Sequence, residues 1–93
     1  GNGNVVEEKR IMPQFVRVVN EGAFNVYIIQ DTVSEIVIEA ESNLIPHIRT
    51  LIKGNTLEID TRDNLRPKFP INLYIKSKEF KKLLDELRQT GRD

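Results

Sequence analysis

Apolar side chains recur at every second position in several short runs of this chain, and that spacing limits what it can fold into. The clearest run is residues 23–30. Its Phe24, Val26 and Ile28 fall on one face of an extended chain. Short runs with this period, bounded by turn residues, are typical of half-buried β-strands. The sequence therefore predicts a mainly β domain built from six or seven short strands.

Two pairs of runs have the spacing of β-hairpins. Residues 31–34 separate the run 23–30 from the alternating run 35–41, so these two are predicted to pair as an antiparallel hairpin. Gly54 and Asn55 join a second hairpin, because both residue types tolerate the positive φ that two-residue turns require. The other predicted strands are a weakly pairing one at 5–10, a short one at 15–19, the hairpin arms 49–53 and 56–61, and a last one at 70–76.

The hydrophobic period changes at the C-terminal end. Apolar side chains at helical spacing predict an amphipathic helix over residues 78–90: Phe80, Leu83, Leu84 and Leu87. We expect this helix to cap an otherwise open sheet face. Ser42 or Asn43 is expected to cap a single helical turn, which Pro46 keeps short. The predicted core residues are Phe24, Val26, Ile38, Leu57, Ile59, Leu73 and Leu83.

Composition excludes several classes of protein. The 93 residues contain no Cys, which excludes a disulfide scaffold, a thiol nucleophile and a Cys-ligated metal site. Lys plus Arg and Asp plus Glu both number 14, so the chain lacks the strongly basic character of a dedicated nucleic-acid binder. No apolar stretch approaches the roughly 20 residues of a transmembrane helix. We expect one small domain over residues 1–93, with no nucleic-acid partner and no transmembrane segment.

The polar residues do not form a recognisable catalytic motif. The single histidine, His47, lies in a predicted turn, and no serine has the context of a nucleophile elbow, so we expect a structural role for His47. Glu39 and Glu41, and likewise Glu58 and Asp60, lie two residues apart and could form an acid/base or oxygen-ligand cluster. Alternation favours the simpler interpretation, the solvated face of a half-buried strand. The sequence predicts no enzyme, no cofactor and no metal site.

Charge is unevenly distributed along the chain. Residues 1–46 hold three basic and seven acidic groups, and residues 47–93 hold eleven basic and seven acidic groups. Four lysines near the predicted helix could form a patch that binds an anionic glycan or lipid headgroup: Lys76, Lys78, Lys81 and Lys82. The alternative is a solubilising surface whose lysines protect a sheet edge. This alternative is favoured because no aromatic stacking platform accompanies the lysines.

Several short motifs occur in a characteristic order. They are GNGNVV at 1–6, GAFNVYI at 22–28, NLIPHI at 43–48, GNTLEI at 54–59 and PINLYI at 70–75. Together they resemble the bacterial head GIN domain family, described as putative auto-transporter adhesins. The resemblance covers about residues 1–83. Because domains of that family are usually longer, the chain resembles a truncated or short variant, equivalent to the N-terminal part of a head GIN domain.

The resemblance carries its own expectations. It implies strands stacked into a right-handed β-solenoid, export to the periplasm or cell surface, and no catalytic residues. We therefore expect a non-enzymatic envelope domain that acts in adhesion or assembly, with self-association or an envelope glycan as its interaction. A second hypothesis is an anionic glycan- or lipid-binding module that uses the lysine cluster. A third is a hydrolase that uses the paired carboxylates.

Overall fold

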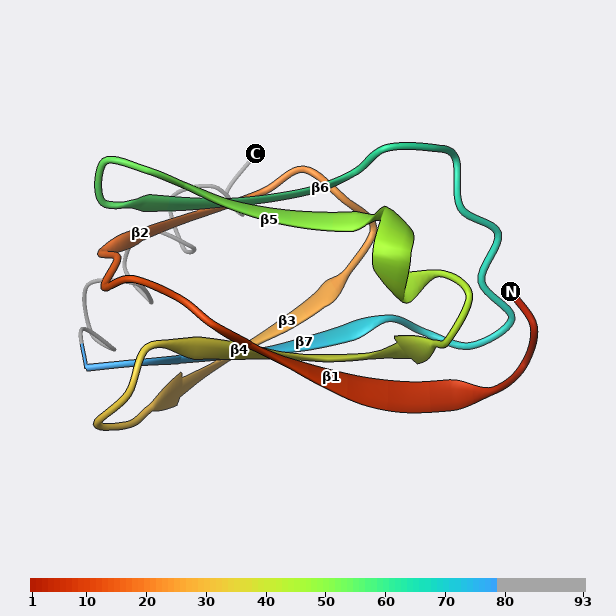
Figure 1. Ribbon diagram of the computed structural model, residues 1–93, viewed down its shortest axis with the longest axis horizontal. Coiled ribbons are helices and arrows are strands. Elements are labelled where there is room, and N and C mark those ends of the chain that lie inside the picture. Colours follow the sequence, from red (N-terminus) through yellow and green to blue (C-terminus); the bar gives the residue numbers. More distant parts are fainter. Residues whose placement is uncertain (79–93) are drawn as a thin grey trace.

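The computed structural model of this chain describes residues 1–78, which form seven β-strands and one short 3₁₀ turn (Figure 1). The predicted mainly β class is confirmed, because each apolar run at period two forms a strand. The elements are β1 (Val5–Ile11), β2 (Arg17–Asn20), β3 (Asn25–Gln30), β4 (Glu35–Glu41), η1 (Ile45–His47), β5 (Ile48–Lys53), β6 (Thr56–Thr61) and β7 (Asn72–Ser77).

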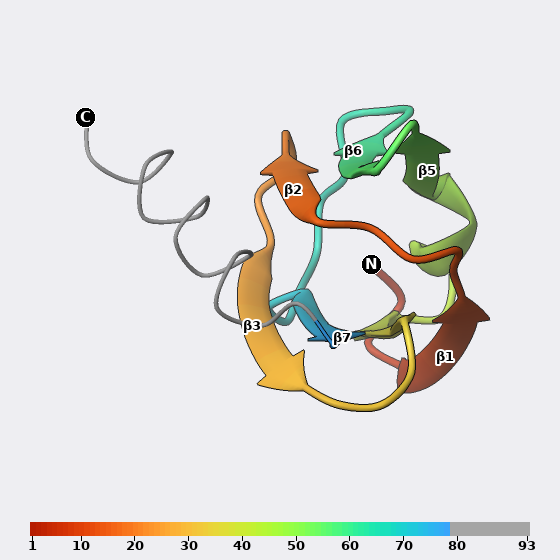
Figure 2. The same cartoon turned by 90° about the vertical axis from the view of Figure 1, so that its left-hand side faces the viewer.

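The strands form two layers that face each other. One layer is a four-stranded sheet in the order β1-β4-β7-β3, and the other is a three-stranded sheet in the order β2-β6-β5. Viewed from the end, β3 and β2 lie along one side of the sandwich, and β1 and β5 lie along the other (Figure 2). Arg10 of β1 bridges this second side, because its guanidinium donates to the carbonyls of Ile48 (2.8 Å) and Ile45 (3.2 Å).

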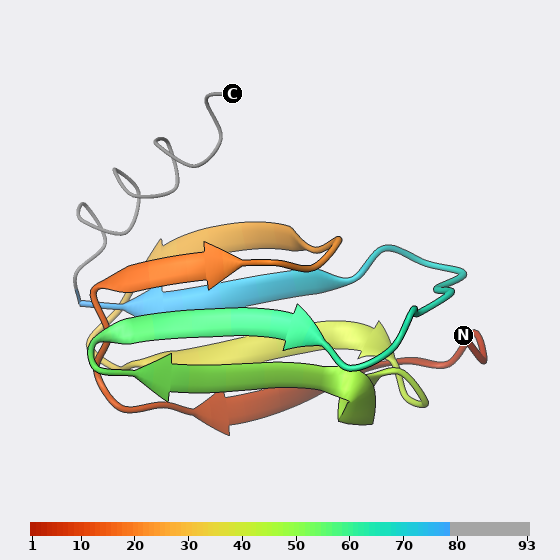
Figure 3. The ribbon, with the colours of Figure 1, turned by 90° about the horizontal axis from the view of Figure 1, so that it is seen from above.

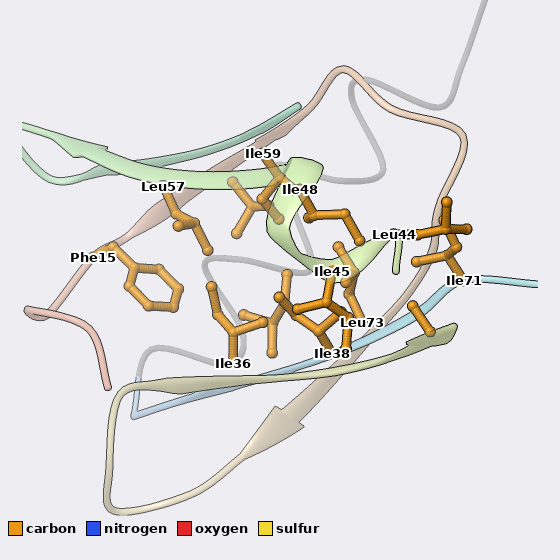
Figure 4. Close-up of a cluster of buried hydrophobic side chains, with 13 residues drawn as sticks. Phe15, Ile36, Ile38, Leu44, Ile45, Ile48, Leu57, Ile59, Ile71 and Leu73 are labelled. Carbon is orange, nitrogen blue, oxygen red and sulfur yellow. The ribbon is translucent and has the colours of Figure 1, made fainter. Parts of the chain in front are cut away.

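The core fills the space between the two sheets (Figure 4). Four of the predicted core residues are fully buried there: Ile38, Leu57, Ile59 and Leu73. Phe24 and Val26 are half-buried and pack against the core from its margin. Leu83 lies outside the described residues. The core residues that the sequence prediction did not name are Phe15, Val18, Ile36, Ala40, Leu44, Ile45, Ile48, Ile71 and Ile75.

The predicted hairpin between residues 23–30 and 35–41 is wrong. β7 lies between these strands, parallel to β3 and antiparallel to β4. A short repeat explains this arrangement, because β3 and β7 both carry the pattern Asn-x-Tyr-Ile. In the parallel register Asn25 donates its side-chain amide to Asn72 (3.1 Å), and the rings of Tyr27 and Tyr74 stack with centroids 5.2 Å apart. A β3–β4 hairpin would lose both side-chain ladders.

The second predicted hairpin is confirmed. β5 and β6 pair as antiparallel strands joined by Gly54 and Asn55, and Gly54 has a φ of 62°. The expected single helical turn is also present as η1, with Pro46 in its first turn. Its predicted cap is wrong, since Leu44 occupies the N-cap position without a side-chain hydrogen bond. Asn43 instead accepts a hydrogen bond from the backbone N–H of Asn2 (3.0 Å).

The predicted solenoid-like stack is also wrong. The strands divide between two separate sheets with mixed parallel and antiparallel pairing, which do not close into a solenoid. Residues 1–78 contain no α-helix, and the helix expected over 78–90 lies, apart from Lys78, outside the described residues. The solenoid is an expectation from the family resemblance, and period-two alternation could not test it, because alternation predicts strands without determining how they are shared between sheets.

Two segments cross from the three-stranded sheet to the four-stranded sheet side by side. β2 runs parallel to β6 before the crossing, and β3 runs parallel to β7 after it (Figure 3). Asn20 is paired with Ile59, and Asn25 with Asn72. The first crossing therefore uses four residues, 21–24, and the second uses twelve, 60–71. We call these segments the short crossover and the long crossover.

Candidate functional site

A cavity of about 260 Å³ lies between the two crossovers. The cavity forms because the two crossovers join the same two pairs of parallel strands, β2–β6 and β3–β7, with four and twelve residues. The longer segment therefore bulges away from the shorter one. The backbone N–H of Glu21 donates to Ile59 (2.9 Å) and that of Asn25 donates to Ile71 (2.9 Å), which fixes both ends. The lining residues that the structure describes all belong to a crossover: Glu21, Gly22, Ala23, Phe24, Thr61, Asp63, Asn64, Leu65, Pro67 and Ile71.

The short crossover supplies an aromatic wall to the cavity. The Gly22 N–H donates to the side-chain carbonyl of Asn20 (3.0 Å), which tightens the turn. The ring of Phe24 then lies so close to Gly22 that a Cβ there would be 2.1 Å from the ring edge. A side chain at this position would therefore require the Phe24 ring to move. The half-buried Phe24 joins the core on one side and the cavity on the other.

The long crossover is held by residues that are distant in the sequence. Near its start, the N–H of Arg62 donates to the carbonyl of His47 (3.1 Å). The Nδ1 of His47 lies 2.8 Å from a carboxylate oxygen of Asp63. The expected structural role of His47 agrees with this contact, since it ties η1 to the cavity wall.

Glu41, at the end of β4, holds the other end of the long crossover. Its side chain is 1% exposed, and its carboxylate accepts hydrogen bonds from the backbone N–H groups of Lys68 (2.6 Å), Phe69 (3.0 Å) and Gly3 (2.7 Å). Burial acts to raise the pKa of Glu41, but these donors and the amino group of Gly1 outweigh it, so the pKa lies below its ordinary value. The predicted solvated face is therefore wrong for Glu41.

The other candidate carboxylates lie away from the cavity. Asp60 accepts two hydrogen bonds of 2.7 Å from Arg49 directly across the strand pair, and Glu58 lies 3.7 Å from Lys53. The hydrogen bond from Arg49, together with its charge, lowers the pKa of Asp60. Glu39 accepts from the side chain of an asparagine in β7 (2.7 Å). Neither predicted pair is assembled into an acid/base site in the described part of the chain.

The structure places only two of the four candidate lysines. Lys76 lies 3.5 Å from Glu35, which is also 3.9 Å from Lys9, so its charge is balanced locally. Lys78 is exposed beyond the end of β7. Lys81 and Lys82 lie outside the described residues. The four-lysine patch therefore stays a prediction.

The cavity itself was not predicted from the sequence. Its lining combines apolar walls (Phe24, Leu65 and Ile71) with two carboxylates (Glu21 and Asp63) and with amide and hydroxyl groups, and the part of the chain that the structure describes adds no Lys or Arg to it. Among residues 1–78 no three His, Cys, Asp or Glu side chains are grouped to hold a metal ion. The same residues include no helix with the length and hydropathy to cross a membrane. The arrangement suits binding of a small polar ligand through hydrogen bonds.

The fold is similar to those of several solved bacterial proteins. A putative adhesin from Parabacteroides merdae matches 84% of this chain with a TM-score of 0.72 and 20% identity, over 33% of its own length. A putative adhesin from Bacteroides fragilis matches 83% with a TM-score of 0.73 and 17% identity, over 37% of its length.

A third solved structure has a different description. A putative lipid binding protein from Parabacteroides distasonis matches 87% of this chain with a TM-score of 0.69 and 24% identity, over 37% of its length. The chain thus spans about a third of the length of these proteins. No curated protein sequence matches it significantly.

The family resemblance noted in the sequence is confirmed by comparison with family models. The model described as "Putative auto-transporter adhesin, head GIN domain" matches residues 14–85, which include both crossovers and six of the seven strands. The chain therefore belongs to the head GIN domain family.

Proposed function

We propose that this chain is a non-enzymatic domain of the bacterial envelope, located in the periplasm or at the cell surface, that binds its partner with the crossover end of the sandwich in adhesion or assembly. One observation carries the proposal: the long crossover is fixed by backbone and side-chain anchors around a preformed cavity. Membership of a family of described adhesins supports it.

The anchors matter because they reduce the cost of binding. A loop that is already ordered loses little conformational entropy when a ligand binds, so its contacts contribute more to affinity. Functional residues on loops that a rigid scaffold positions are common for this reason. The long crossover has such a scaffold, since Glu41 and His47 hold it from two different parts of the chain.

A pull-down with envelope material tests this proposal. We expect the purified chain to bind Bacteroides or Parabacteroides envelope preparations saturably, without releasing products from them. A variant with Glu21→Ala and Asn64→Ala at the cavity should bind at least fivefold more weakly. A variant with Glu7→Ala and Asn43→Ala, away from the cavity, should bind like the wild type. Catalytic turnover of the envelope material, or equal binding by both variants, would contradict the proposal.

The lysine cluster supports a second candidate, an anionic lipid- or glycan-binding module. One solved relative in fold is described as a lipid binding protein, and Lys78 is exposed. Vesicles containing an anionic phospholipid should bind the chain in a way that weakens with salt. Changing Lys78, Lys81 and Lys82 to Glu should abolish binding, and the same change at Lys9, Arg17 and Lys53 should leave most of it. Equal loss in both variants would exclude a lysine-specific site.

Self-association is a further prediction of the assembly role. Sedimentation velocity over a hundredfold range of concentration would measure it directly. We expect the sedimentation coefficient to rise with concentration, and a constant monomer value would exclude self-association of this chain.

A further inference from the structure

We propose that the cavity between the crossovers binds one neutral sugar ring. The inference rests on the proposed function, because it names the ligand class of the same binding end. It commits to an uncharged saccharide unit of an envelope glycan, and it contrasts with the anionic ligand that the lysine cluster would take.

The charge of the lining selects against anions. Glu21 and Asp63 both line the cavity, and the lining residues within 1–78 include no Lys or Arg. A phosphate, sulfate or uronate would therefore meet the like charge of these two carboxylates, whereas Arg62 and Arg66 of the long crossover are not among the described lining residues. Carboxylates instead accept hydrogen bonds from hydroxyl groups, which a neutral sugar offers in number. One oxygen of Asp63 contacts His47 Nδ1 at 2.8 Å, which orients this carboxylate in the cavity wall.

The apolar part of the lining suits the ring face of a sugar, as its polar part suits the hydroxyl groups. A pyranose has C–H groups on its ring faces and hydroxyl groups around its edge. Phe24 and Leu65 provide apolar contact area in front of the buried Ile71, while Thr61 and Asn64 add a hydroxyl and an amide beside it. Ligand sites commonly combine apolar walls with a few convergent polar groups.

Size and rigidity complete the argument. The volume of about 260 Å³ is below the roughly 300–1,000 Å³ typical of sites for drug-sized ligands, so one ring fits better than an extended oligomer. The walls are fixed by the Glu21–Ile59 and Asn25–Ile71 hydrogen bonds at the ends of the crossovers.

Titration by ¹H–¹⁵N NMR with matched sugars tests the proposal. The probes are D-glucose, D-galactose and N-acetyl-D-glucosamine, with D-glucuronate and D-galacturonate as counterparts that add only a carboxylate. We expect at least one neutral sugar to shift the amide signals of Gly22, Ala23, Asn64 and Leu65 saturably. The matching uronate should bind about tenfold more weakly or not at all. Equal binding of neutral and uronate forms, shifts confined to other surfaces, or no saturable shift would overturn the proposal.

A pair of glutamate variants sharpens the test. Glu21→Ala removes an acceptor from the cavity and should weaken sugar binding about tenfold, which is the loss of one hydrogen bond to a charged group. Glu7→Ala removes an exposed glutamate from β1 and should leave the affinity unchanged. Both variants should keep the wild-type pattern of undisturbed amide signals. Equal affinity of the two variants would place the sugar elsewhere.

The same reagents separate this inference from the proposed function. If the chain binds envelope material but an excess of the bound sugar does not compete, the ligand class is wrong and the adhesion proposal stands. If the sugar binds the cavity and the envelope material does not bind the chain, the ligand class stands and the adhesion proposal is wrong.

Discussion

The two crossovers start and finish in the same strand register, yet they are ordered by different means. The short crossover is fixed locally, because its four residues include the glycine that lets the Phe24 ring fold back over the turn. The long crossover has few such contacts of its own. It is ordered by Glu41, which precedes Lys68 by 27 residues, and by His47, which precedes Asp63 by 16. A segment can thus be rigid through local packing or through anchors supplied by the rest of the fold.

The difference has a consequence for function. Apart from Asp63, which contacts His47, the long crossover can change its exposed residues without losing its Glu41 anchor, since backbone N–H groups make the contacts with Glu41. The short crossover cannot change its residues in this way, because the Phe24 ring occupies the space that a side chain at residue 22 would need. We therefore expect the long crossover to determine ligand specificity, with the short one as a constant wall.

Truncating a core side chain next to both crossovers should have the largest effect on stability. Ile59 is fully buried, and its carbonyl accepts the hydrogen bond from Glu21 where the crossovers begin. Ile59→Ala should lower the free energy of unfolding by about 2–5 kcal/mol, as measured by urea denaturation. Ile11→Ala, at a side chain that is 73% exposed, serves as the control and should cost less than about 0.5 kcal/mol. A similar loss of stability in both variants would contradict the assignment of Ile59 to the core and of Ile11 to the surface.

A methyl group on Gly22 should disturb the short crossover alone. Gly22 does not have a positive φ, so Gly22→Ala acts through the collision with the Phe24 ring and should cost about 1–3 kcal/mol. Adding Phe24→Leu removes the ring, so the double variant should lose less than the sum of the single losses. Strict additivity in this double-mutant cycle would show that Gly22 and Phe24 do not interact.

Neutralising Glu41 should loosen the long crossover and leave the short one ordered. Because the folded pKa lies below the ordinary value of about 4.3, ionised Glu41 stabilises the fold above that pH, and this stabilisation is lost as the pH falls through the lowered pKa. Glu41→Gln should therefore be less stable than the wild type at pH 7 but differ less from it at pH 3. A stability difference that does not change with pH would contradict the carboxylate anchor.

The smallest effect is expected for the His47 anchor. His47 and Asp63 are 44% and 64% exposed, so solvent screens their interaction. His47→Ala should change the free energy of unfolding by about 0–1 kcal/mol. Its effect should be seen instead as faster hydrogen exchange at the N–H of Arg62, which donates to the His47 carbonyl. Unchanged exchange there would limit the anchoring role to Glu41.

The sequence predicts elements better than their partners. Alternation at residues such as Leu57 and Ile59 identifies strands and their buried faces, because a two-residue period follows from strand geometry. It does not reveal that β7 enters between β3 and β4, although the repeated Asn-x-Tyr-Ile pattern was a usable signal. Glu41 could not be identified from its own surroundings, since its burial depends on residues 3, 68 and 69.

The cavity was beyond sequence reasoning for a related reason. It arises from the unequal lengths of two crossovers, and this inequality appears only once the parallel registers of β2–β6 and β3–β7 are known. Parallel pairing between segments about 40 residues apart leaves little mark in local composition. The lysine cluster, which composition did suggest, includes Lys76, whose charge is balanced by Glu35.

Native-state hydrogen exchange at four amides tests the central claim, that the long crossover is as fixed as the short one. Glu21 and Asn25 mark the ends of the short crossover, and Lys68 and Phe69 mark the Glu41 anchor. We predict slow exchange at all four amides near neutral pH, with Lys68 and Phe69 alone becoming fast in Glu41→Gln. Slow exchange at Glu21 and Asn25 with unprotected Lys68 and Phe69 in the wild type would contradict the claim.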